Sequence, residues 1–268
     1  MSGTNAENVV LVERAGEVMI ITINRPEARN AVNVPVHMAI GAAMQEADRD
    51  PGIRAVILTG AGELAFCAGA DLRAASRGER VLPQEPEFHA WGFAGFCAHH
   101  ISKPTIAAVN GFAMGGGCEV VLAADLVVAA DTATFGLPEV KRGIIAGSGG
   151  VYRLPRQIPI KAAMEMILIG DPITAQRGLE LGLVNRVVPR EQVLDEALKM
   201  ARQVAANAPL AVQASKRIAR GIVDGQISAE IDVKALNDSE MHVVRRSEDA
   251  REGPLAFVQK RPPVWKAK

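Results

Sequence analysis

Short apolar runs that end in closely spaced glycine and alanine constrain the fold of this chain more than any other feature. The runs RAVILTG (54–60) and PTIAAVNG (104–111) are followed by clusters of small residues, CAGAD (67–71) and MGGGC (114–118). The run LVVAAD (126–131) has the same apolar character. Continuous apolar runs of this length that end in Gly or Asp are typical of buried strands in a parallel sheet. We therefore predict a parallel sheet whose strands end in glycine-rich turns.

Helical segments alternate with these strands. From Val34 to Asp48 the apolar residues recur at helical spacing, which predicts an amphipathic helix. Alternation of strands and helices implies an α/β core. Ahead of this core, residues 9–24 predict a β-hairpin with Gly16 in its turn.

The last third of the chain has a different pattern. Strand signals stop near residue 190, and the segment REQVLDEALKMARQVAANAP predicts a helix that Pro209 ends. Residues 210–224 and 228–246 predict two more helices. We expect two units, a core over 1–205 and a C-terminal helical region over 206–268.

One segment of the core is irregular. Residues 73–100 mix charge, proline and aromatic residues, and we predict a surface loop that enters a helix near Phe88. Such loops often line binding pockets.

Composition limits the functions open to the chain. Its 268 residues are 49% hydrophobic, enough for a sizeable core, and 30 basic residues balance 30 acidic ones. Zero net charge gives no overall attraction to nucleic acid or to an anionic membrane. The apolar runs are far shorter than the roughly 20 residues of a membrane span, and the N-terminal MSGTNAENVV lacks the basic and apolar regions of a signal peptide. We expect a cytoplasmic protein that binds neither nucleic acid nor membrane.

Cysteine and histidine show no metal-site or disulfide pattern. The three cysteines form no C-x-x-C pair, and the five histidines lack the spacing of a metal-binding helix. An odd number of cysteines argues against a disulfide framework. We expect no metal site and three reduced, buried thiols, Cys67, Cys97 and Cys118.

The two glycine clusters predict an anion-binding site made of backbone. Gly69 permits a turn in which N–H groups point at a ligand without side-chain obstruction. Gly115 to Gly117 lie between a strand and a helix, where free N–H groups and the helix dipole favour negative charge. Two such elements that face each other would form an oxyanion hole.

Two carboxylates accompany this site. Glu119 lies three residues after Gly116, so on a helix it would share that residue's face, and Glu139 follows a strand-like segment and Pro138. Two partly desolvated carboxylates near one anion hole can act as general acid and general base. Purely structural roles remain open, since Glu119 can interact with the helix dipole and Glu139 can pair with a following basic residue, Lys141 or Arg142.

Other motifs fit poorly. G-x-G-x-x-G would need glycine where Val120 stands, and no phosphate-binding G-x-x-x-x-G-K-[ST] occurs. IAGSGG approaches the nucleophile elbow G-x-S-x-G at Ser148, but Ala146 occupies the first glycine position and no clear strand precedes it.

The chain resembles a known family through an ordered series of motifs. ITINRPEARNAV, AVILTGAGELAFCAGADL, KPTIAAVNGFAMGGGCEVVLAADLVVAA, FGLPEVKRGI, GGVYRLPR, GLVNRVVP and SEDAREGPLAFVQKRPPVW are similar, in order, to those of the crotonase (enoyl-CoA hydratase/isomerase) superfamily. The resemblance runs from about Val9 to Trp265. The ending SEDAREGPLAFVQKRPPVW, together with LPEVKRGI and SGGVYRLPR, is closer to the crotonobetainyl-CoA hydratase (carnitinyl-CoA dehydratase) branch than to fatty-acid hydratases.

This resemblance implies a fold, an assembly and a reaction. The fold is a spiral of ββα units with a C-terminal helical trimerisation region, assembled as a homotrimer or a dimer of trimers. The implied substrate is an acyl-coenzyme A thioester, coenzyme A being part of the substrate, with no metal or other cofactor. The N–H groups of Ala68 and Gly116 would form the oxyanion hole. Glu119 and Glu139 would be the catalytic pair that hydrates an enoyl thioester.

The resemblance also implies a substrate-binding set and leaves alternatives open. Positions that match coenzyme A or acyl contacts are Ala28, Ala31, Ala68, Gly69, Ala70, Asp71, Leu72, Gly115, Gly116, Pro138, Phe257 and Lys260. A trimethylammonium acyl group would favour an aromatic or acidic box, for which Glu85, Glu87, Trp91 and Phe93 are candidates, though they fit ordinary loop and core roles equally. The fold also hosts isomerases, hydrolases and decarboxylases, and a non-catalytic acyl-CoA-binding or RNA-binding role is a remote alternative.

The family's G-I-I-P-G-A-G-G loop is GIIAGSGG here, with Ala146 and Ser148 as departures. These two substitutions bear on how the acyl group is positioned beside Glu139.

Overall fold

A computed structural model of the chain describes residues 9–76 and 79–268. Residues 1–8 of the N-terminal stretch in which we expected no signal peptide lie outside the described residues, as do residues 77–78 of the expected surface loop. Among the helices that the structure describes, none is long and apolar enough to cross a membrane.

The larger sheet has six strands in the order β1-β2-β3-β5-β7-β10. The hairpin pair β1 and β2 is antiparallel, and all other neighbours are parallel. Helix α8 packs across the central strands, which are almost wholly buried. The strands are Val10–Ala15 (β1), Val18–Ile23 (β2), Ala55–Gly60 (β3), Thr105–Val109 (β5), Leu126–Ala130 (β7) and Arg186–Val188 (β10). The predicted buried parallel strands are confirmed.

A smaller sheet of four strands, in the order β4-β6-β8-β9, lies beside the first. Its strands are Ala65–Cys67 (β4), Phe112–Met114 (β6), Thr134–Gly136 (β8) and Ile173–Thr174 (β9). Strands β3, β5 and β7 of the larger sheet are each followed in the chain by a strand of the smaller one, so the chain repeats a strand-strand unit as it winds. Because β4, β6 and β8 are parallel, their carboxyl ends meet at one edge. That edge carries the glycine-rich turns.

The amphipathic helix predicted from Val34 to Asp48 is confirmed. Helix α1 (Val34–Arg49) begins after Asn33, whose side chain accepts a hydrogen bond of 3.2 Å from the Val36 N–H. The hairpin turn contains Gly16 at φ +68°, as predicted. The other core helices are η2 (Pro26–Ala28), α2 (Leu72–Ser76), α3 (Pro86–His89), η3 (Phe93–Gly95), α4 (Gly116–Ala123), η4 (Pro138–Arg142), α5 (Gly150–Gln157), α6 (Ile160–Ile169), α7 (Ala175–Leu181), η5 (Arg190–Gln192) and α8 (Val193–Ala205).

The C-terminal region is helical, with corrected boundaries. The helix expected to reach Pro209 ends at Ala205, and Pro209 instead begins the next helix, where its missing N–H costs no hydrogen bond. Two short strands form a hairpin although no strand was expected after residue 190. The elements are α9 (Pro209–Arg220), β11 (Ile222–Val223), β12 (Gln226–Ile227), η6 (Ser228–Glu230), α10 (Ile231–Arg246) and α11 (Asp249–Val258).

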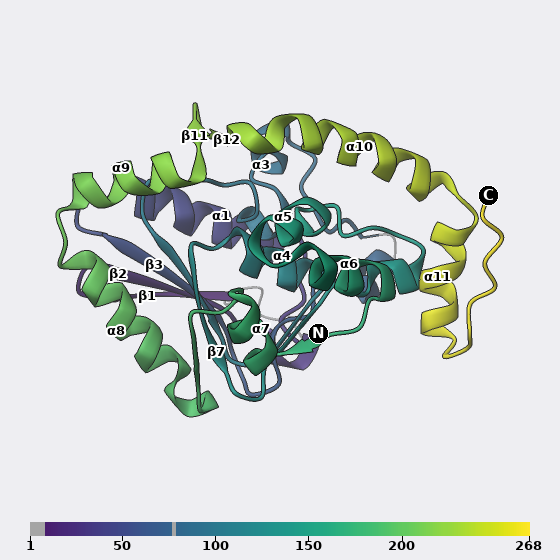
Figure 1. Cartoon of the computed structure of the whole chain (residues 1–268), viewed down its shortest axis with the longest axis horizontal. Coiled ribbons are helices and arrows are strands. Elements are labelled where there is room, and N and C mark those ends of the chain that lie inside the picture. Colours follow the sequence, from purple (N-terminus) through teal and green to yellow (C-terminus); the bar gives the residue numbers. More distant parts are fainter. Residues whose placement is uncertain (1–8, 77–78) are drawn as a thin grey trace, which may run out of the picture.

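Figure 1 shows α9 and α10 along one side of the molecule and α11, in yellow, at the end near the C-terminus. Helix α11 has no counterpart in the sequence prediction. It contains Pro254, and proline inside a sequence normally predicts the end of a helix because it lacks the N–H for a helical hydrogen bond. Packing overrides that signal, since a Cβ on Gly253 would lie 2.1 Å from the Arg142 carbonyl oxygen. This close backbone contact joins α11 to η4.

The segment 73–100 is only partly a surface loop. Its second half is core, because Trp91, Phe93 and Phe96 are buried against α1. Trp91 stacks between His37 and His99, with ring centroids 6.0 and 4.9 Å away. The predicted surface excursion is therefore wrong for residues 91–97, a buried aromatic cluster that follows the charged and proline-rich first half of the segment.

Candidate active site

A cavity of about 330 Å³ opens at the edge where β4, β6 and β8 end. Because the three parallel strands end together, they bring three loops to one place. The lining residues from these loops are Ala68, Gly69, Ala70, Gly115, Gly116, Pro138 and Glu139, together with Glu119 one helical turn further on. The structure thus unites both glycine clusters and both predicted carboxylates.

The start of α4 needs glycine because backbone approaches it closely. Gly115 has φ +56°, and a Cβ on Gly117 would lie 2.0 Å from the Cys67 carbonyl oxygen at the end of β4. Gly116 is the first residue of α4, so its N–H has no carbonyl partner within the helix. A Cβ on Gly69 would lie 3.1 Å from the Gly116 nitrogen, which places the two glycine turns in contact. The arrangement offers backbone donors to an anion in the cavity.

The second donor differs from the one that the resemblance implies. The Ala68 N–H donates to the Arg29 carbonyl oxygen at 3.0 Å, and the Gly69 N–H points to the Cys67 sulfur at 3.4 Å. Ala68 is therefore corrected as a hole donor, because its N–H is already used. The Ala70 N–H lies in the lining and has no acceptor among the described residues. Ala70 is the better partner for Gly116.

Glu119 is a buried carboxylate with fixed partners. Its side chain projects from the first turn of α4 and is 3% exposed, and one carboxylate oxygen, Oε1, accepts a 2.9 Å hydrogen bond from the Gly150 N–H at the start of α5. Burial raises the pKa of this carboxyl to about 7, although the N–H groups of Gly150 and Ser148 and the charge of Arg153 oppose that rise. Near neutral pH this carboxyl can therefore exchange a proton.

Glu139 is held more loosely. It lies in η4, and its Oε1 is 3.0 Å from the place that a Cβ on Gly115 would occupy. Its Oε2 is buried and has no hydrogen-bond partner among the described residues. Burial and the neighbouring charge of Glu119 raise the pKa of Glu139 to about 8. A buried carboxylate oxygen without a partner indicates a ligand group or water at that position.

The surface pairing considered for Glu139 does not occur among the described contacts. Lys141 pairs with Asp171, and the Arg142 guanidinium lies over the Phe257 ring, 4.0 Å from its centroid. Neither cation neutralises Glu139, which faces the cavity instead.

The remaining predicted binding residues divide into two groups. Leu72 and Pro138 line the cavity together with the glycine turns. Asp71 does not line it, because its carboxylate bonds to Arg25 at 2.9 Å and accepts from the Ala74 N–H at the start of α2. The other residues outside the lining are Ala28, Ala31, Phe257 and Lys260.

Several residues that line the cavity are absent from the sequence prediction. Met241 and Arg245 reach the cavity from α10, and their spacing of four residues on one helix is the signal that sequence reasoning overlooked. The other missed residues are Val81, Leu82, Ile144, Ile145 and Gly147. Of the residues weighed for a trimethylammonium box, Phe93 lines the cavity, Trp91 is stacked in the core, and Glu85 and Glu87 are exposed.

Other nucleophiles are poorly placed. Ser148 lies in the irregular segment between η4 and α5, not after a strand, and its hydroxyl and N–H face Glu119. The three cysteines are buried and free, and burial raises the pKa of the Cys67 thiol to about 12. Among the described residues no group of three His, Cys, Asp or Glu side chains is arranged to hold a metal ion.

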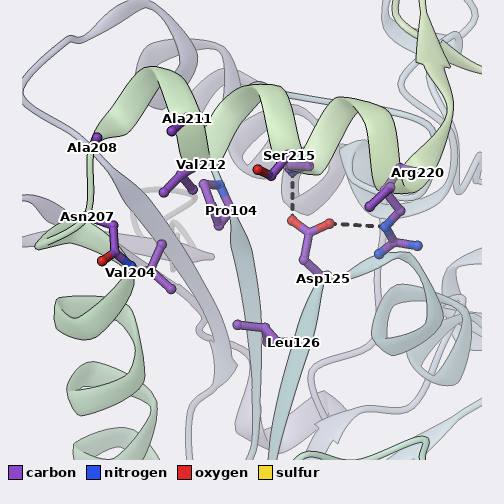
Figure 2. A pocket seen from close by; sticks show the side chains of 12 residues that line it. Pro104, Asp125, Leu126, Val204, Asn207, Ala208, Ala211, Val212, Ser215 and Arg220 are labelled. Carbon is purple, nitrogen blue, oxygen red and sulfur yellow. Dashed lines mark hydrogen bonds and ion pairs between the residues drawn. The ribbon is translucent and has the colours of Figure 1, made fainter.

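A second cavity of about 480 Å³ lies where α8 and α9 meet β5 and β7 (Figure 2). Its acidic side chain, Asp125, is fully engaged, since its carboxylate pairs with Lys216 at 2.7 Å and Arg220 at 3.1 Å and accepts from the Thr105 N–H at 2.8 Å. These bonds fasten α9 to the core. The first cavity therefore remains the candidate active site.

A spiral of strand pairs that presents free backbone N–H groups and two carboxyls of raised pKa offers the groups that enzymes use to activate a carbonyl compound. The comparisons with known proteins agree. The profile of the enoyl-CoA hydratase/isomerase family matches residues 13–268, and the chain belongs to this family. The resemblance, the fold class and the hydratase type of enzyme predicted from sequence are thereby confirmed.

Individual relatives are similar over nearly the whole chain. A carnitinyl-CoA dehydratase from Salmonella arizonae is 45% identical over 257 residues, which cover 94% of this chain and 96% of that protein. The crystal structure of a carnitinyl-CoA hydratase from Mycobacterium avium has a TM-score of 0.95 at 55% identity, covering 98% of this chain and 100% of that chain. An enoyl-CoA hydratase structure from Mycobacterium tuberculosis H37Rv has a TM-score of 0.75 at 45% identity, with 98% and 100% coverage.

Proposed function

We propose that the protein adds water reversibly across the C2–C3 double bond of a 2-enoyl-CoA thioester. One observation carries this proposal: two carboxyls with raised pKa, Glu119 and Glu139, face the same cavity as the free N–H of Gly116. Hydration requires a base for water, an acid for C2 and a donor for the thioester oxygen, and these three roles match the groups present.

The backbone donors stabilise the charge that develops on the substrate. When the water oxygen bonds to C3, the π electrons move toward the thioester carbonyl, whose oxygen becomes enolate-like. The N–H groups of Gly116 and Ala70 would donate to that oxygen. Removing one donor of this kind costs roughly 3 to 4 kcal/mol of transition-state stabilisation.

The two carboxyls move the protons. One ionised carboxylate accepts a proton from the attacking water, and the protonated carboxyl delivers its proton to C2, so atoms and charge balance. A pair that is singly protonated near neutral pH meets this need, and the raised pKa of each carboxyl supports that state. Reversal of the same steps dehydrates a 3-hydroxyacyl-CoA.

For the acyl group we propose the carnitinyl branch, that is, crotonobetainyl-CoA as the enoyl substrate. The names and the extent of similarity of the Salmonella arizonae and Mycobacterium avium proteins support this choice. In the cavity, the aromatic side chain is Phe93 and the acidic ones are the two glutamates, so a cationic acyl group would lie against these. The alternative is a general hydratase of uncharged short-chain enoyl thioesters.

Further expectations from the sequence remain part of this proposal. We infer a homotrimer or dimer of trimers, supported by exposed apolar side chains on the C-terminal helices, among them Leu210, Ile218 and Leu236. From the sequence pattern, the composition and the family resemblance we also propose a core over 1–205 followed by a C-terminal region over 206–268. On the same grounds we propose that the protein needs no metal or other cofactor and that it is cytoplasmic. Coenzyme A contacts at the outlying positions, such as Phe257 and Lys260, are proposed as well.

The testing experiment follows the loss of enoyl-thioester absorbance with crotonyl-CoA and crotonobetainyl-CoA side by side. Preference for crotonobetainyl-CoA is the expected result. Faster turnover of crotonyl-CoA would replace the carnitinyl proposal by the general hydratase, and no turnover of either would contradict hydration.

A further inference from the structure

Arg153 is a nearly fully buried cation one turn into α5, only 3% exposed. Its guanidinium forms two bonds with the Glu230 carboxylate, at 2.9 and 2.8 Å, and donates to the Cys97 carbonyl oxygen at 2.7 Å. Glu230 ends η6 in the C-terminal region, and Cys97 follows η3 in the core. Arg153 therefore links three segments that are far apart in the sequence.

The same helix supplies the hydrogen bond to Glu119. The donor is the Gly150 N–H in the first turn of α5, three residues before Arg153. The position of that turn is thus fixed from one side by Glu119 and from the other by the Arg153 bonds. Movement of α5 would change the distance from the Gly150 N–H to the carboxylate.

Arg153 also differs in charge from its neighbours around Glu119. The titratable and charged side chains that face Glu119 are Glu139 from η4, Cys97 beside η3, Cys118 from α4, and Tyr152 and Arg153 from α5. Burial raises the pKa of both of these cysteines and of Tyr152, so they are neutral. In this set Arg153 is the buried cation, and the exposed Arg245 of α10 is a second cation that lines the same cavity as Glu119.

We propose that Arg153 is the positioning residue of Glu119, holding the first turn of α5 against its carboxylate and stabilising the ionised form, with Glu230 of the C-terminal region setting the strength of that effect. The proposal rests on the proposed function only in taking Glu119 as a working acid or base. It gives the C-terminal region a part in the chemistry besides assembly.

The sign of the effect can be tested with two opposite changes. Arg153→Met removes the cation and leaves Glu230 uncompensated, so ionised Glu119 is disfavoured and its titration midpoint rises. Glu230→Gln removes the anion that offsets Arg153, so the midpoint falls. Arg153→Lys keeps the charge and should retain the midpoint.

A matched control lies one turn away. Arg156 is exposed and donates to the Ala229 carbonyl oxygen at 2.8 Å, beside Glu230, so Arg156→Met loosens the same junction without removing a buried charge. Loss of stability alone would move every variant in one direction.

The measurement is the titration of the buried carboxyl by infrared difference spectroscopy in a Glu139→Gln background, where Glu119 is the remaining carboxyl of the pair. We expect Arg153→Met to raise the midpoint and Glu230→Gln to lower it, each by roughly half a pH unit or more, with Arg153→Lys and Arg156→Met unchanged. Equal midpoints, or shifts of the same sign, would overturn the proposal.

If Arg153→Met does not fold, the titration midpoint of Glu230→Gln compared with that of Arg156→Met is sufficient to test the proposal. When Glu139 is kept, the acid limb of the pH–rate profile should move in the same directions, upward in pH for Arg153→Met and downward for Glu230→Gln. Shifted midpoints in a protein that hydrates neither substrate would contradict the proposed function while leaving the role of Arg153 intact.

Discussion

The first turn of α4 and the short helix η4 each present one glutamate to the same cavity, but the molecule supports them differently. Glu119 on α4 is enclosed in the core and bonded to the Gly150 N–H. Glu139 on η4 has a buried oxygen without a hydrogen-bond partner among the described residues. One carboxylate is held in place by protein, and the other retains an oxygen for a ligand.

The C-terminal region contacts both regions. It reaches Glu119 through Glu230, Arg153 and α5, and it reaches Glu139 because α11 packs against η4. The contrast is therefore between an inner carboxylate fixed by hydrogen bonds and an outer one fixed by the packing of its backbone. That difference suits an inner group that positions water and an outer group that exchanges a proton with substrate.

The largest expected effect is on turnover. Glu139→Gln should lose roughly 10²- to 10⁴-fold in kcat, since a positioned acid or base contributes that much. Binding of a saturated acyl-CoA, measured by calorimetry, should stay within a few-fold because the amide has nearly the same shape. Unchanged turnover would mean that Glu139 takes no part in the chemistry.

The next largest effect is on stability as a function of pH. Both carboxyls have a pKa above their ordinary value of 4.5 in the folded protein, so the fold binds more protons than the unfolded chain between about pH 4.5 and 8. The free energy of unfolding should therefore fall as pH rises through this window by several kcal/mol, at about 1.4 kcal/mol for each pH unit by which a pKa is raised.

Denaturant unfolding of the wild type and of Glu119→Gln/Glu139→Gln at pH 5, 6.5 and 8 measures this effect. The double variant should lack this component and gain stability relative to wild type at pH 8. Parallel pH dependences in the two proteins would contradict raised carboxyl pKa values.

A smaller effect separates the two carboxylates directly. Glu119→Ala leaves the buried Gly150 N–H without its acceptor, whereas Glu119→Gln retains an oxygen there, so the alanine variant should be less stable by about 1 to 3 kcal/mol. Glu139→Ala and Glu139→Gln should differ by less, since Oε2 of Glu139 accepts no bond among the described residues. Equal differences at the two positions would mean that the carboxylates are held alike.

Much of this arrangement could be predicted from the chain itself. The continuous apolar runs indicate buried parallel strands, and the glycine clusters mark places where backbone approaches backbone, such as Gly117 against Cys67. Glu119 is recognisable because it follows those glycines by one helical turn. These features depend on local sequence.

The rest depends on contacts between distant segments, which spacing does not encode. Because the Ala68 N–H donates to the Arg29 carbonyl oxygen, the proposed hole donor becomes Ala70, and nothing in CAGAD distinguishes the two alanines. Met241 and Arg245 enter the cavity only because α10 crosses it, and α11 forms through Pro254 because it packs on η4. The Arg153–Glu230 pair likewise joins residues 77 positions apart.

The smallest expected effect concerns the outer support of Glu139. The Arg142 guanidinium at the end of η4 lies over the half-exposed Phe257 ring of α11, a contact worth about 0.5 to 1 kcal/mol at an exposed site. Phe257→Leu keeps an apolar side chain but removes the ring, so η4 should hold Glu139 less firmly, and kcat should fall a few-fold. The matched control is Leu255→Ala, an exposed α11 side chain outside this contact.

Because Phe257 is also a proposed coenzyme A contact, KM and kcat must be measured separately. A rise in KM with kcat unchanged would assign Phe257 to coenzyme A binding and not to the support of η4. If Phe257→Leu lowers kcat in the wild type but causes no further fall in a Glu139→Gln background, the ring acts through Glu139, since two changes that act through one group are not additive. The inner carboxylate provides the reference, because Phe257→Leu in a Glu119→Gln background should retain its own few-fold cost if α11 acts on η4 alone.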